Sequence, residues 1–221
     1  MNTQDTNKRI RLIMHLRNKG ITDTRVLSAM EKVPRDAYVP DVMQDQAWDD
    51  IALPIGSGQT ISQPFVVASM TQALQISDRD KVLEVGTGCG YQCAVLSKLC
   101  RRVYTIERHR PLLLEAEKRL DAQRLRNITA IAGDGMKGWP QQAPFDKIIV
   151  TAAAKERPPP ALLEQLKDGG LMVIPVSVDG AQVLRLYKKE SGEAYSIKDL
   201  MPVRFVPLLP DLAAADESAQ A

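Results

Sequence analysis

Residues 58–67 (GQTISQPFVV) are rich in side chains that can orient a reactant and poor in side chains that can move a proton. Thr60 and Ser62 offer hydroxyls and Gln63 offers an amide, whereas the stretch has no histidine and no acidic residue. An amine or alcohol acceptor would need a base close by, but a carboxylate acceptor, with a pKa of about 4, is already ionised at neutral pH. These neutral donors therefore favour a site that aligns a carboxylate with an activated electrophile.

A glycine-rich loop follows, in VLEVGTGCGYQ (residues 82–92). Gly86, Gly88 and Gly90 stand at alternate positions between a strand-like run and a helix-like run, where glycine allows tight turns and close approach of a ligand to the backbone. The first N–H groups of the next helix would favour a polar or anionic group. A dinucleotide fingerprint would have a small residue where Tyr91 stands, which weakens the prediction of a pyrophosphate site.

Acidic residues stand in or at the end of three successive strand candidates. Glu84 lies inside the strand before the glycine loop, and could accept bonds from an amino group or support N–H groups of the loop. Glu107 ends RVYTIE, where a carboxylate can bind both ribose hydroxyls, and Asp134 in AGDG could receive an adenine amino group. This set suits S-adenosylmethionine better than NAD, and the sequence resembles the class I S-adenosylmethionine-dependent methyltransferases.

The segment after the fourth expected strand of this sheet bears on the acceptor. Many methyltransferases of amide or amine nitrogens carry an Asn/Asp-Pro-Pro-aromatic turn there, whereas this chain has VTAAAKERPPP (residues 150–160). Of the two histidines, His15 is expected in a solvated helix and His109 in a loop, and neither is expected to act as a base. The sequence therefore favours a carboxylate acceptor over an amine.

The order of expected elements predicts an α/β fold. Apolar residues recur at helical spacing as far as Pro34, a loop-rich segment follows, and a helix starts at Pro64. From Lys81, short apolar runs alternate with amphipathic stretches, which predicts a doubly wound, mostly parallel sheet, with MPVRFVPL as its last strand. We expect a single domain over residues 1–221: N-terminal helices and a covering loop (1–75), a Rossmann-like core (76–209) and a disordered tail (210–221).

The composition excludes several partners. The 29 basic and 27 acidic residues are spread along the chain and give a formal net charge of +2, so no field of one sign favours nucleic acid or a membrane. The three cysteines suit a reducing compartment rather than a disulfide framework, and no histidine stands near them to complete a metal site. No apolar run is long enough to cross a bilayer, so we expect a cytoplasmic protein.

Several motifs together carry a more specific resemblance. ALPIGSGQTISQP, VLEVGTGCGYQ, GDG, APFDKIIVTAAA followed by PPALLEQLKDGG, and VRFVPL are similar to the protein-L-isoaspartate O-methyltransferase family over residues 12–208. The resemblance implies methyl esterification of the free α-carboxylate of isoaspartyl residues in aged peptides and proteins. The donor would be S-adenosylmethionine, and the ester would close to a succinimide that partly reopens as aspartate. A monomer without a metal is expected.

The resemblance also assigns roles by position. Ser62 matches the active-site serine proposed for the family, with Thr60 beside it in the same loop. Cys89 stands where family members often have serine, but its backbone N–H is available whatever its side chain. The expected cofactor-binding residues are Ile61, Gln63, Glu84, Gly86, Thr87, Gly88, Cys89, Gly90, Glu107, Asp134 and Gly135.

Other interpretations stay open from the sequence. Ser62 could serve as the N-cap of the helix that starts at Pro64. The enzyme could methylate a small-molecule acid, or the protein could bind S-adenosylmethionine as a regulator without transferring a methyl group. A dehydrogenase is disfavoured by Tyr91 and Glu84.

Overall fold

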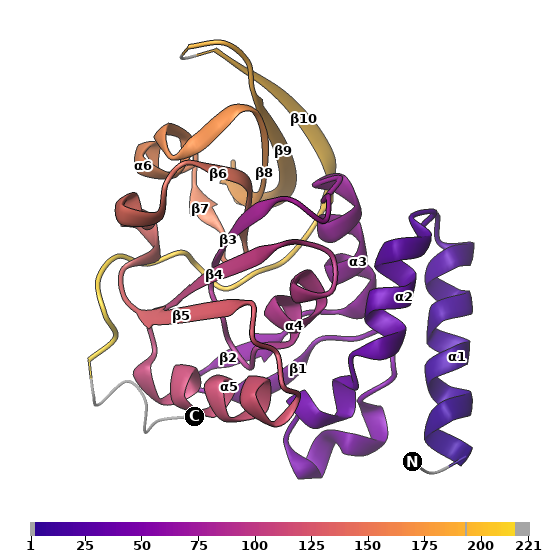
Figure 1. The fold of residues 1–221 in the computed structure, drawn as a ribbon. Coiled ribbons are helices and arrows are strands. Elements are labelled where there is room, and N and C mark those ends of the chain that lie inside the picture. Colours follow the sequence, from indigo (N-terminus) through magenta and orange to yellow (C-terminus); the bar gives the residue numbers. More distant parts are fainter. Residues whose placement is uncertain (1–2, 193, 215–221) are drawn as a thin grey trace.

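The computed structural model describes residues 3–192 and 194–214, and a sheet of eight strands forms its centre (Figure 1). The strand order is β10-β9-β8-β6-β3-β4-β5, with β7 paired to β8. The pairs from β5 through β8 are parallel, whereas β8, β9 and β10 pair antiparallel. The prediction of a doubly wound, mostly parallel sheet is therefore confirmed. The strands of the sheet are β3 (Lys81–Val85), β4 (Arg102–Glu107), β5 (Ile128–Ala132), β6 (Phe145–Val150), β7 (Ala154–Lys155), β8 (Leu166–Val178), β9 (Ala181–Lys189) and β10 (Tyr195–Pro202).

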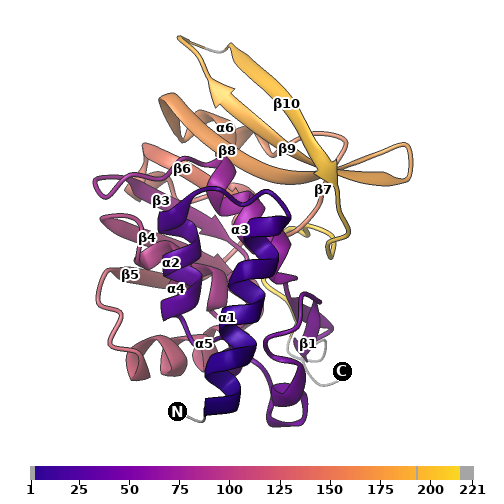
Figure 2. The same ribbon diagram turned by 90° about the vertical axis from the view of Figure 1, so that its right-hand side faces the viewer.

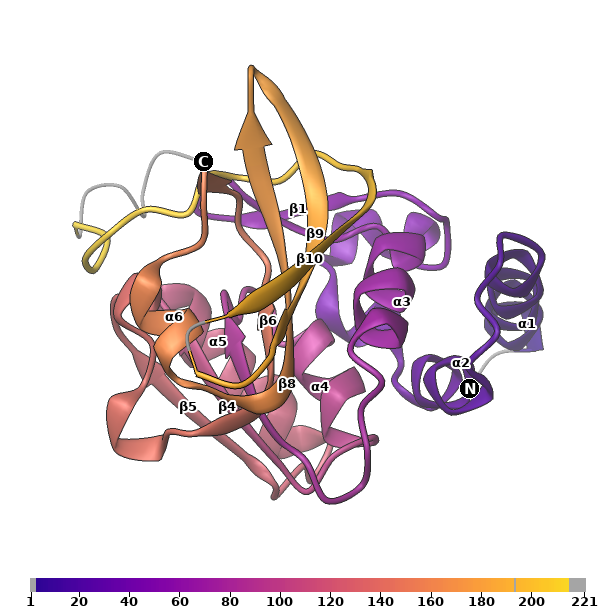
Figure 3. The same cartoon turned by 90° about the horizontal axis from the view of Figure 1, so that it is seen from above.

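Helices cover both faces of this sheet, and the N-terminal pair lies outermost (Figure 3). Helix α2 packs against α3 and α4, and α1 packs against α2 and α3. The two N-terminal helices predicted from the periodicity are present and are joined around Gly20. The helices are α1 (Thr3–Asn18), α2 (Thr24–Lys32), α3 (Pro64–Ala73), α4 (Tyr91–Ser97), α5 (Arg110–Ala122) and α6 (Pro160–Glu164), with 3-10 turns η1 (Arg35–Tyr38), η2 (Asp41–Gln46), η3 (Gly135–Lys137) and η4 (Pro140–Gln142).

Alternation along the central strands divides the core into two layers. Val82 and Val103 pack in the cluster that contains the apolar side chains of α2, α3 and α4. Leu83 and Ile106 pack in a second cluster, which includes Leu162 of α6. Both faces of β3 and β4 are thus buried, as expected for parallel strands covered by helices.

A small hairpin interrupts the expected loop before α3. Strands β1 (Leu53–Gly56) and β2 (Gln59–Ile61) pair antiparallel, with positive φ values at Gly56, which ends β1, and at Gly58 in the turn. Their brevity and glycine content hid them from the periodicity analysis. The hairpin lies apart from the main sheet and faces the carboxyl ends of its strands (Figures 1 and 2).

The end of the described chain crosses the carboxyl ends of the strands. The prediction that MPVRFVPL forms the last strand is wrong from Val203 onward, because only Met201 and Pro202 belong to β10 and residues 203–214 form a crossing segment. Ala153 holds this segment by donating to the Val206 carbonyl (2.8 Å) and accepting from the Leu208 N–H (2.8 Å). Ala213 N–H donates to the Arg108 carbonyl (3.1 Å), so the described part of the predicted disordered tail is bonded to the core. Residues 215–221 lie outside the described residues.

Among residues 3–192 and 194–214, no helix combines the length and the apolar character needed to cross a membrane. The same residues contain no cluster of three or more His, Cys, Asp or Glu side chains suited to hold a metal ion.

Candidate active site

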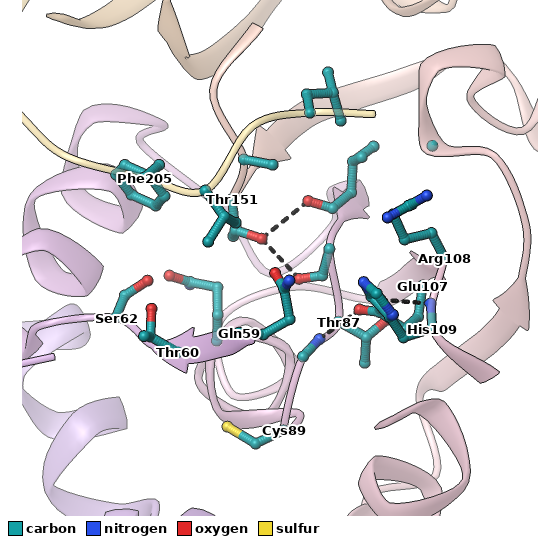
Figure 4. A pocket seen from close by; sticks show the side chains of 18 of the residues that line it. Gln59, Thr60, Ser62, Thr87, Cys89, Glu107, Arg108, His109, Thr151 and Phe205 are labelled. Carbon is teal, nitrogen blue, oxygen red and sulfur yellow. Dashed lines mark hydrogen bonds between the residues drawn. The ribbon is translucent and has the colours of Figure 1, made fainter. Parts of the chain in front are cut away.

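A cavity opens at the carboxyl ends of β3, β4 and β6, between the β1–β2 hairpin and the crossing segment (Figure 4). It has about 1160 Å³ of space between its walls, part of it open to solvent. Its walls come mainly from residues 58–62, 85–89, 106–109 and 205–209. Ligands of open α/β sheets bind in this position, so the glycine loop and the hydroxyl-rich loop predicted from sequence meet in one site.

The glycine loop takes a shape that its neighbours enforce. Gly86 has φ +95°, and a Cβ there would overlap the hydroxyl of Thr151. That hydroxyl donates to the carbonyls of Val85 (3.0 Å) and Gly86 (2.8 Å), which ties the end of β3 to the end of β6. Thr151 itself lines the cavity, although the sequence analysis assigned it no role. A polar residue directly after a buried strand was the signal that could have identified it.

Glu107 is fixed at one end of the cavity. Its side chain is almost fully buried, with the residue 4% exposed, and it lines the wall. The Gly88 N–H donates to Oε2 (2.8 Å) and the His109 N–H donates to Oε1 (2.9 Å). Each carboxylate oxygen keeps a lone pair for a further donor. The carboxylate therefore fits the predicted contact with the ribose hydroxyls of S-adenosylmethionine.

Glu84 lies beneath the glycine loop instead of on the cavity wall. It is 0% exposed, and Oε2 accepts from the Thr105 hydroxyl at 2.5 Å. The Thr105 hydroxyl is in turn 2.6 Å from the hydroxyl of Thr87, which does line the cavity. Burial raises the pKa of Glu84 to about 8, so the carboxyl is largely protonated at neutral pH. This placement does not give the predicted direct contact with an amino group, and it favours the alternative role of supporting the loop.

Asp134 is likewise not among the residues that line the cavity. Oδ1 accepts from the Met136 N–H (2.9 Å), and Oδ2 is 3.2 Å from Lys137 Nζ. Partial burial raises the pKa of Asp134, but hydrogen bonds from the N–H groups of Asp211 and Met136 and from Lys137 outweigh it and hold the pKa below its usual range. The adjacent Gly135 lines the cavity, so the backbone occupies the place predicted for the carboxylate.

Most of the remaining predicted cofactor residues lie on the wall. Two do not: the Gln63 amide donates to the Asp50 carbonyl (2.8 Å), and Gly90 packs towards Ala116 and Leu120 of α5. The predicted residues that the structure brings together on the wall are Thr60, Ile61, Ser62, Gly86, Thr87, Gly88, Cys89, Glu107 and Gly135.

Thr60 and Ser62 lie at the other end of the cavity, near Phe205 and away from Glu107 and His109 (Figure 4). Ile61 between them is 3% exposed and anchors β2 in the core. In the described part of the chain, neither the Thr60 nor the Ser62 hydroxyl has a hydrogen-bond partner. Both hydroxyls are therefore available to a ligand.

The start of α3 is capped by a distant residue. Gln63 occupies the N-cap position without a side-chain hydrogen bond, and the Phe65 N–H donates to Asp50 Oδ1 (2.8 Å). The alternative interpretation of Ser62 as the helix cap is therefore wrong, because Asp50 supplies the acceptor that a cap would provide.

His109 lines the cavity beside Glu107, whereas the sequence placed it in an unassigned loop. Both of its ring nitrogens are buried without a hydrogen-bond partner among the described residues. Because it lies at the end of the cavity opposite Ser62, it is poorly placed to act as a base for an acceptor bound there (Figure 4).

The parallel sheet, the glycine loop after β3 and the buried acid that ends β4 define a class I S-adenosylmethionine-dependent methyltransferase fold. The sequence model of the family described as protein-L-isoaspartate(D-aspartate) O-methyltransferase (PCMT) matches residues 7–212. The chain belongs to this family.

Relatives and solved structures agree with this membership. The protein-L-isoaspartate O-methyltransferases of Rhodospirillum centenum and Parvibaculum lavamentivorans are 59% and 55% identical over 208 and 210 residues, covering 93% of both chains in each case. A solved protein-L-isoaspartate O-methyltransferase superimposes with a TM-score of 0.84 at 26% identity, over 92% of this chain and 67% of that chain. A PCMT from Plasmodium falciparum, in complex with S-adenosyl-L-homocysteine, shares the fold with a TM-score of 0.79 at 24% identity, over 90% and 97% of the two chains.

Proposed function

We propose that the protein transfers a methyl group from S-adenosylmethionine to the free α-carboxylate of L-isoaspartyl residues in damaged peptides and proteins. One observation carries this proposal: the unengaged hydroxyls of Thr60 and Ser62 face a cavity whose opposite end is fitted with a fixed carboxylate, Glu107. The family to which the chain belongs is described by the same activity. The reaction is a repair step, because the ester can close to a succinimide and reopen as aspartate.

The half of the site proposed to bind the methyl donor, S-adenosylmethionine, has polar groups that the protein holds in fixed positions. Glu107 would accept from the ribose hydroxyls of S-adenosylmethionine, the backbone of residues 86–89 would hold its amino-acid portion, and Gly135 would border its adenine. S-adenosylmethionine, when bound, supplies a methyl group that its sulfonium already activates. The chain has only to hold the methyl carbon at a fixed place relative to Ser62.

The half of the site proposed to bind the methyl acceptor has uncharged hydrogen-bond donors. The Ser62 hydroxyl, with Thr60 beside it, would donate to one oxygen of the isoaspartyl carboxylate and leave the other oxygen free to accept the methyl group. The acceptor arrives ionised, so no proton is removed and no base is required. Phe205 and Leu208 of the crossing segment line the same cavity and limit the access of water to the reacting oxygen.

The proposal is tested with peptides that differ only in the linkage of one aspartyl residue. The protein is mixed with methyl-labelled S-adenosylmethionine and either the isoaspartyl or the aspartyl peptide. We expect base-labile label on the isoaspartyl peptide alone. Equal labelling of both peptides, or labelling of free small-molecule acids without peptides, would overturn the proposal. Calorimetry with S-adenosylhomocysteine and NAD separates the methyltransferase from a dehydrogenase, since only the former compound is expected to bind.

We also propose that the protein acts as a cytoplasmic monomer on isoaspartyl peptides and binds neither nucleic acid nor membranes. The near balance of 29 basic and 27 acidic residues supports this, because it gives no strong field of one sign. Light scattering at two protein concentrations is expected to give the mass of one chain, and a mass that rises with concentration would contradict the monomer.

A further inference from the structure

Arg35 is a fully buried cation that links three separate segments near the active site. The residue is 0% exposed and lies in η1. Its Nη1 donates to the Ala47 carbonyl, and its Nη2 donates to the carbonyls of Ile51 (3.0 Å) and Ser62 (3.2 Å). Ala47 follows η2, Ile51 lies before β1, and Ser62 directly follows β2. One guanidinium therefore connects the two segments that precede the hairpin to the loop that follows it.

Stability alone is a poor explanation for this charge. All the hydrogen bonds of Arg35 go to backbone carbonyls, and it takes part in none of the ion pairs found in the described part of the chain. Burial lowers the pKa of Arg35, which reports the cost of removing the cation from water. Asp50 and Asp49 attract this cation from a distance without forming an ion pair with it, and packed apolar residues often stabilise such a buried position better than a charge does. The planar fork of Arg35 has a geometric use, because it donates in several fixed directions at once.

The bond to Ser62 fixes a residue that little else holds. Ser62 follows the last paired residue of β2, so the hairpin does not pair it. Among the described residues, Arg35 is the donor to its carbonyl, and the neighbouring Gln63 is held separately through Asp50. The position of the Ser62 backbone sets where its hydroxyl can point.

Arg35 also contacts the side of the cavity that is proposed to bind S-adenosylmethionine. Its guanidinium lies 5.8 Å from the centroid of the Tyr91 ring, and Tyr91 lines the cavity at the first turn of α4. The same cation therefore contacts the loop expected to hold the acceptor and the helix that follows the glycine loop. Its geometry sets the spacing between the two halves of the site.

We propose that Arg35 is a positioning residue for the methyl transfer, which holds the Ser62 backbone where the Ser62 hydroxyl meets the acceptor carboxylate. The inference rests on the proposed function. It predicts that loss of the guanidinium lowers turnover more than it lowers affinity for either ligand, because small misplacements of a reactant cost roughly a hundredfold in rate.

Arg25 provides a matched control. It is an exposed arginine of α2 whose guanidinium also joins two backbone carbonyls, those of Ile76 (2.8 Å) and Leu99 (3.1 Å), and none of these residues lines the cavity. Arg35→Lys keeps the charge without the fork, and Arg35→Met removes both. We expect either Arg35 variant to lower kcat for an isoaspartyl peptide by roughly 10 to 100-fold, while KM and the Kd for S-adenosylhomocysteine change by less than about threefold. The same Arg25 variants are expected to lower Tm and to leave kcat within about twofold.

Combining Arg35→Lys with Ser62→Ala tests whether Arg35 acts through Ser62. We expect the effect of Arg35→Lys on kcat to shrink below about threefold in the Ser62→Ala background, because the hydroxyl that Arg35 positions is gone. The inference would be overturned if the fold-losses of kcat in the two single variants multiplied in the double variant. It would also be overturned if Arg35→Lys lowered Tm but left kcat unchanged.

Hydrogen exchange gives a readout that does not depend on activity. In the ligand-free protein, we expect the amides of residues 60–63 to exchange at least about tenfold faster in Arg35→Lys than in the parent, and to be unchanged in Arg25→Lys. Unchanged exchange in both variants would refute the positioning role. If the parent failed to methylate isoaspartyl peptides while the exchange result held, the proposed function would fail and the structural role of Arg35 would stand.

Discussion

The two ends of the cavity differ in how completely their polar groups are bonded within the protein. At the Glu107 end, the backbone N–H groups of Gly88 and His109 fix the carboxylate. At the Ser62 end, the backbone is held by Arg35, but the hydroxyls of Ser62 and Thr60 have no partner among the described residues. One end is built to receive a ligand of constant shape, and the other uses rotatable donors for an acceptor that comes with a variable peptide.

Glu107→Ala tests the fixed end and is expected to have the largest effect. The substitution removes the proposed acceptor for the ribose hydroxyls and leaves the N–H groups of Gly88 and His109 without their partner. Two hydrogen bonds to a charged group contribute about 1.5–3 kcal/mol each, so we expect affinity for S-adenosylhomocysteine to fall by roughly a thousandfold. Calorimetry measures the Kd. Glu115→Ala, which removes an exposed carboxylate paired to Lys118, serves as the control and is expected to bind normally; a Glu107→Ala variant that bound equally well would place the cofactor elsewhere.

Ser62→Ala tests the open end. We expect kcat for the isoaspartyl peptide to fall by roughly a hundredfold, the loss typical of one orienting donor, while the Kd for S-adenosylhomocysteine stays within about twofold. Ser69→Ala on α3 removes a hydroxyl that does not line the cavity and is expected to keep full turnover. Unchanged turnover in Ser62→Ala would reduce Ser62 to a loop residue without a part in the reaction.

Glu84→Gln tests the protonation state of the buried carboxyl group beneath the glycine loop, at the fixed end of the cavity. The folded pKa of about 8 is above the ordinary value of 4.5, so the folded protein binds this proton more tightly than the unfolded chain. The resulting stability is fully present below pH 4.5 and is lost as the pH rises through 8. The loss amounts to a few kcal/mol across that window, on the order of 1.4 kcal/mol per unit of pKa difference.

Glutamine imitates the protonated acid and does not ionise, so the variant is expected to lack this decline. Urea unfolding at pH 5 and pH 8 gives the free energy of unfolding of the parent and of the variant at each pH, and the decline is the difference between the two pH values. Glu117→Gln, at an exposed position of α5, is the control and is expected to keep the decline of the parent. Parallel pH profiles for the parent and Glu84→Gln would mean that Glu84 is ionised in the folded protein.

The sequence predicted the elements that depend on local signals. The alternation of short apolar runs with amphipathic stretches defined the parallel sheet, and the glycines of residues 86–90 marked the loop between β3 and α4. Glu107 was placed correctly on the cavity wall, because a residue that ends a parallel strand reaches the edge where ligands bind. MPVRFVPL failed as a strand beyond Pro202, because the edge strand β10 runs over the mostly exposed residues Tyr195–Pro202, whose polar character hid it, and the chain then leaves the sheet.

The sequence could not reveal which groups are turned inward. Glu84 stands one residue before the end of β3, and its face of the sheet lies under α4 rather than on the cavity. Asp134 accepts a hydrogen bond from the Met136 N–H of its own 3-10 turn, and residue spacing alone does not show whether its carboxylate takes this donor or one from a ligand. Arg35 and Asp50 act on residues 15 to 27 positions away, through contacts that exist only once the N-terminal segment has folded against the loop.

Cys89 offers the smallest expected effect and the finest test of the fixed end. It lines the cavity, but burial raises the pKa of its thiol to about 11, so at pH 8 it is protonated and unreactive. If the glycine loop binds through its backbone, Cys89→Ser is expected to change kcat and the Kd for S-adenosylhomocysteine by less than about threefold, since a hydroxyl leaves the N–H in place. Cys93→Ser, beside Glu84 in the core, is expected to lower Tm instead. A fall of tenfold or more in affinity for Cys89→Ser alone would show that the thiol itself packs against the ligand, and the fixed end would then recognise its cofactor by side-chain shape as well as by backbone donors.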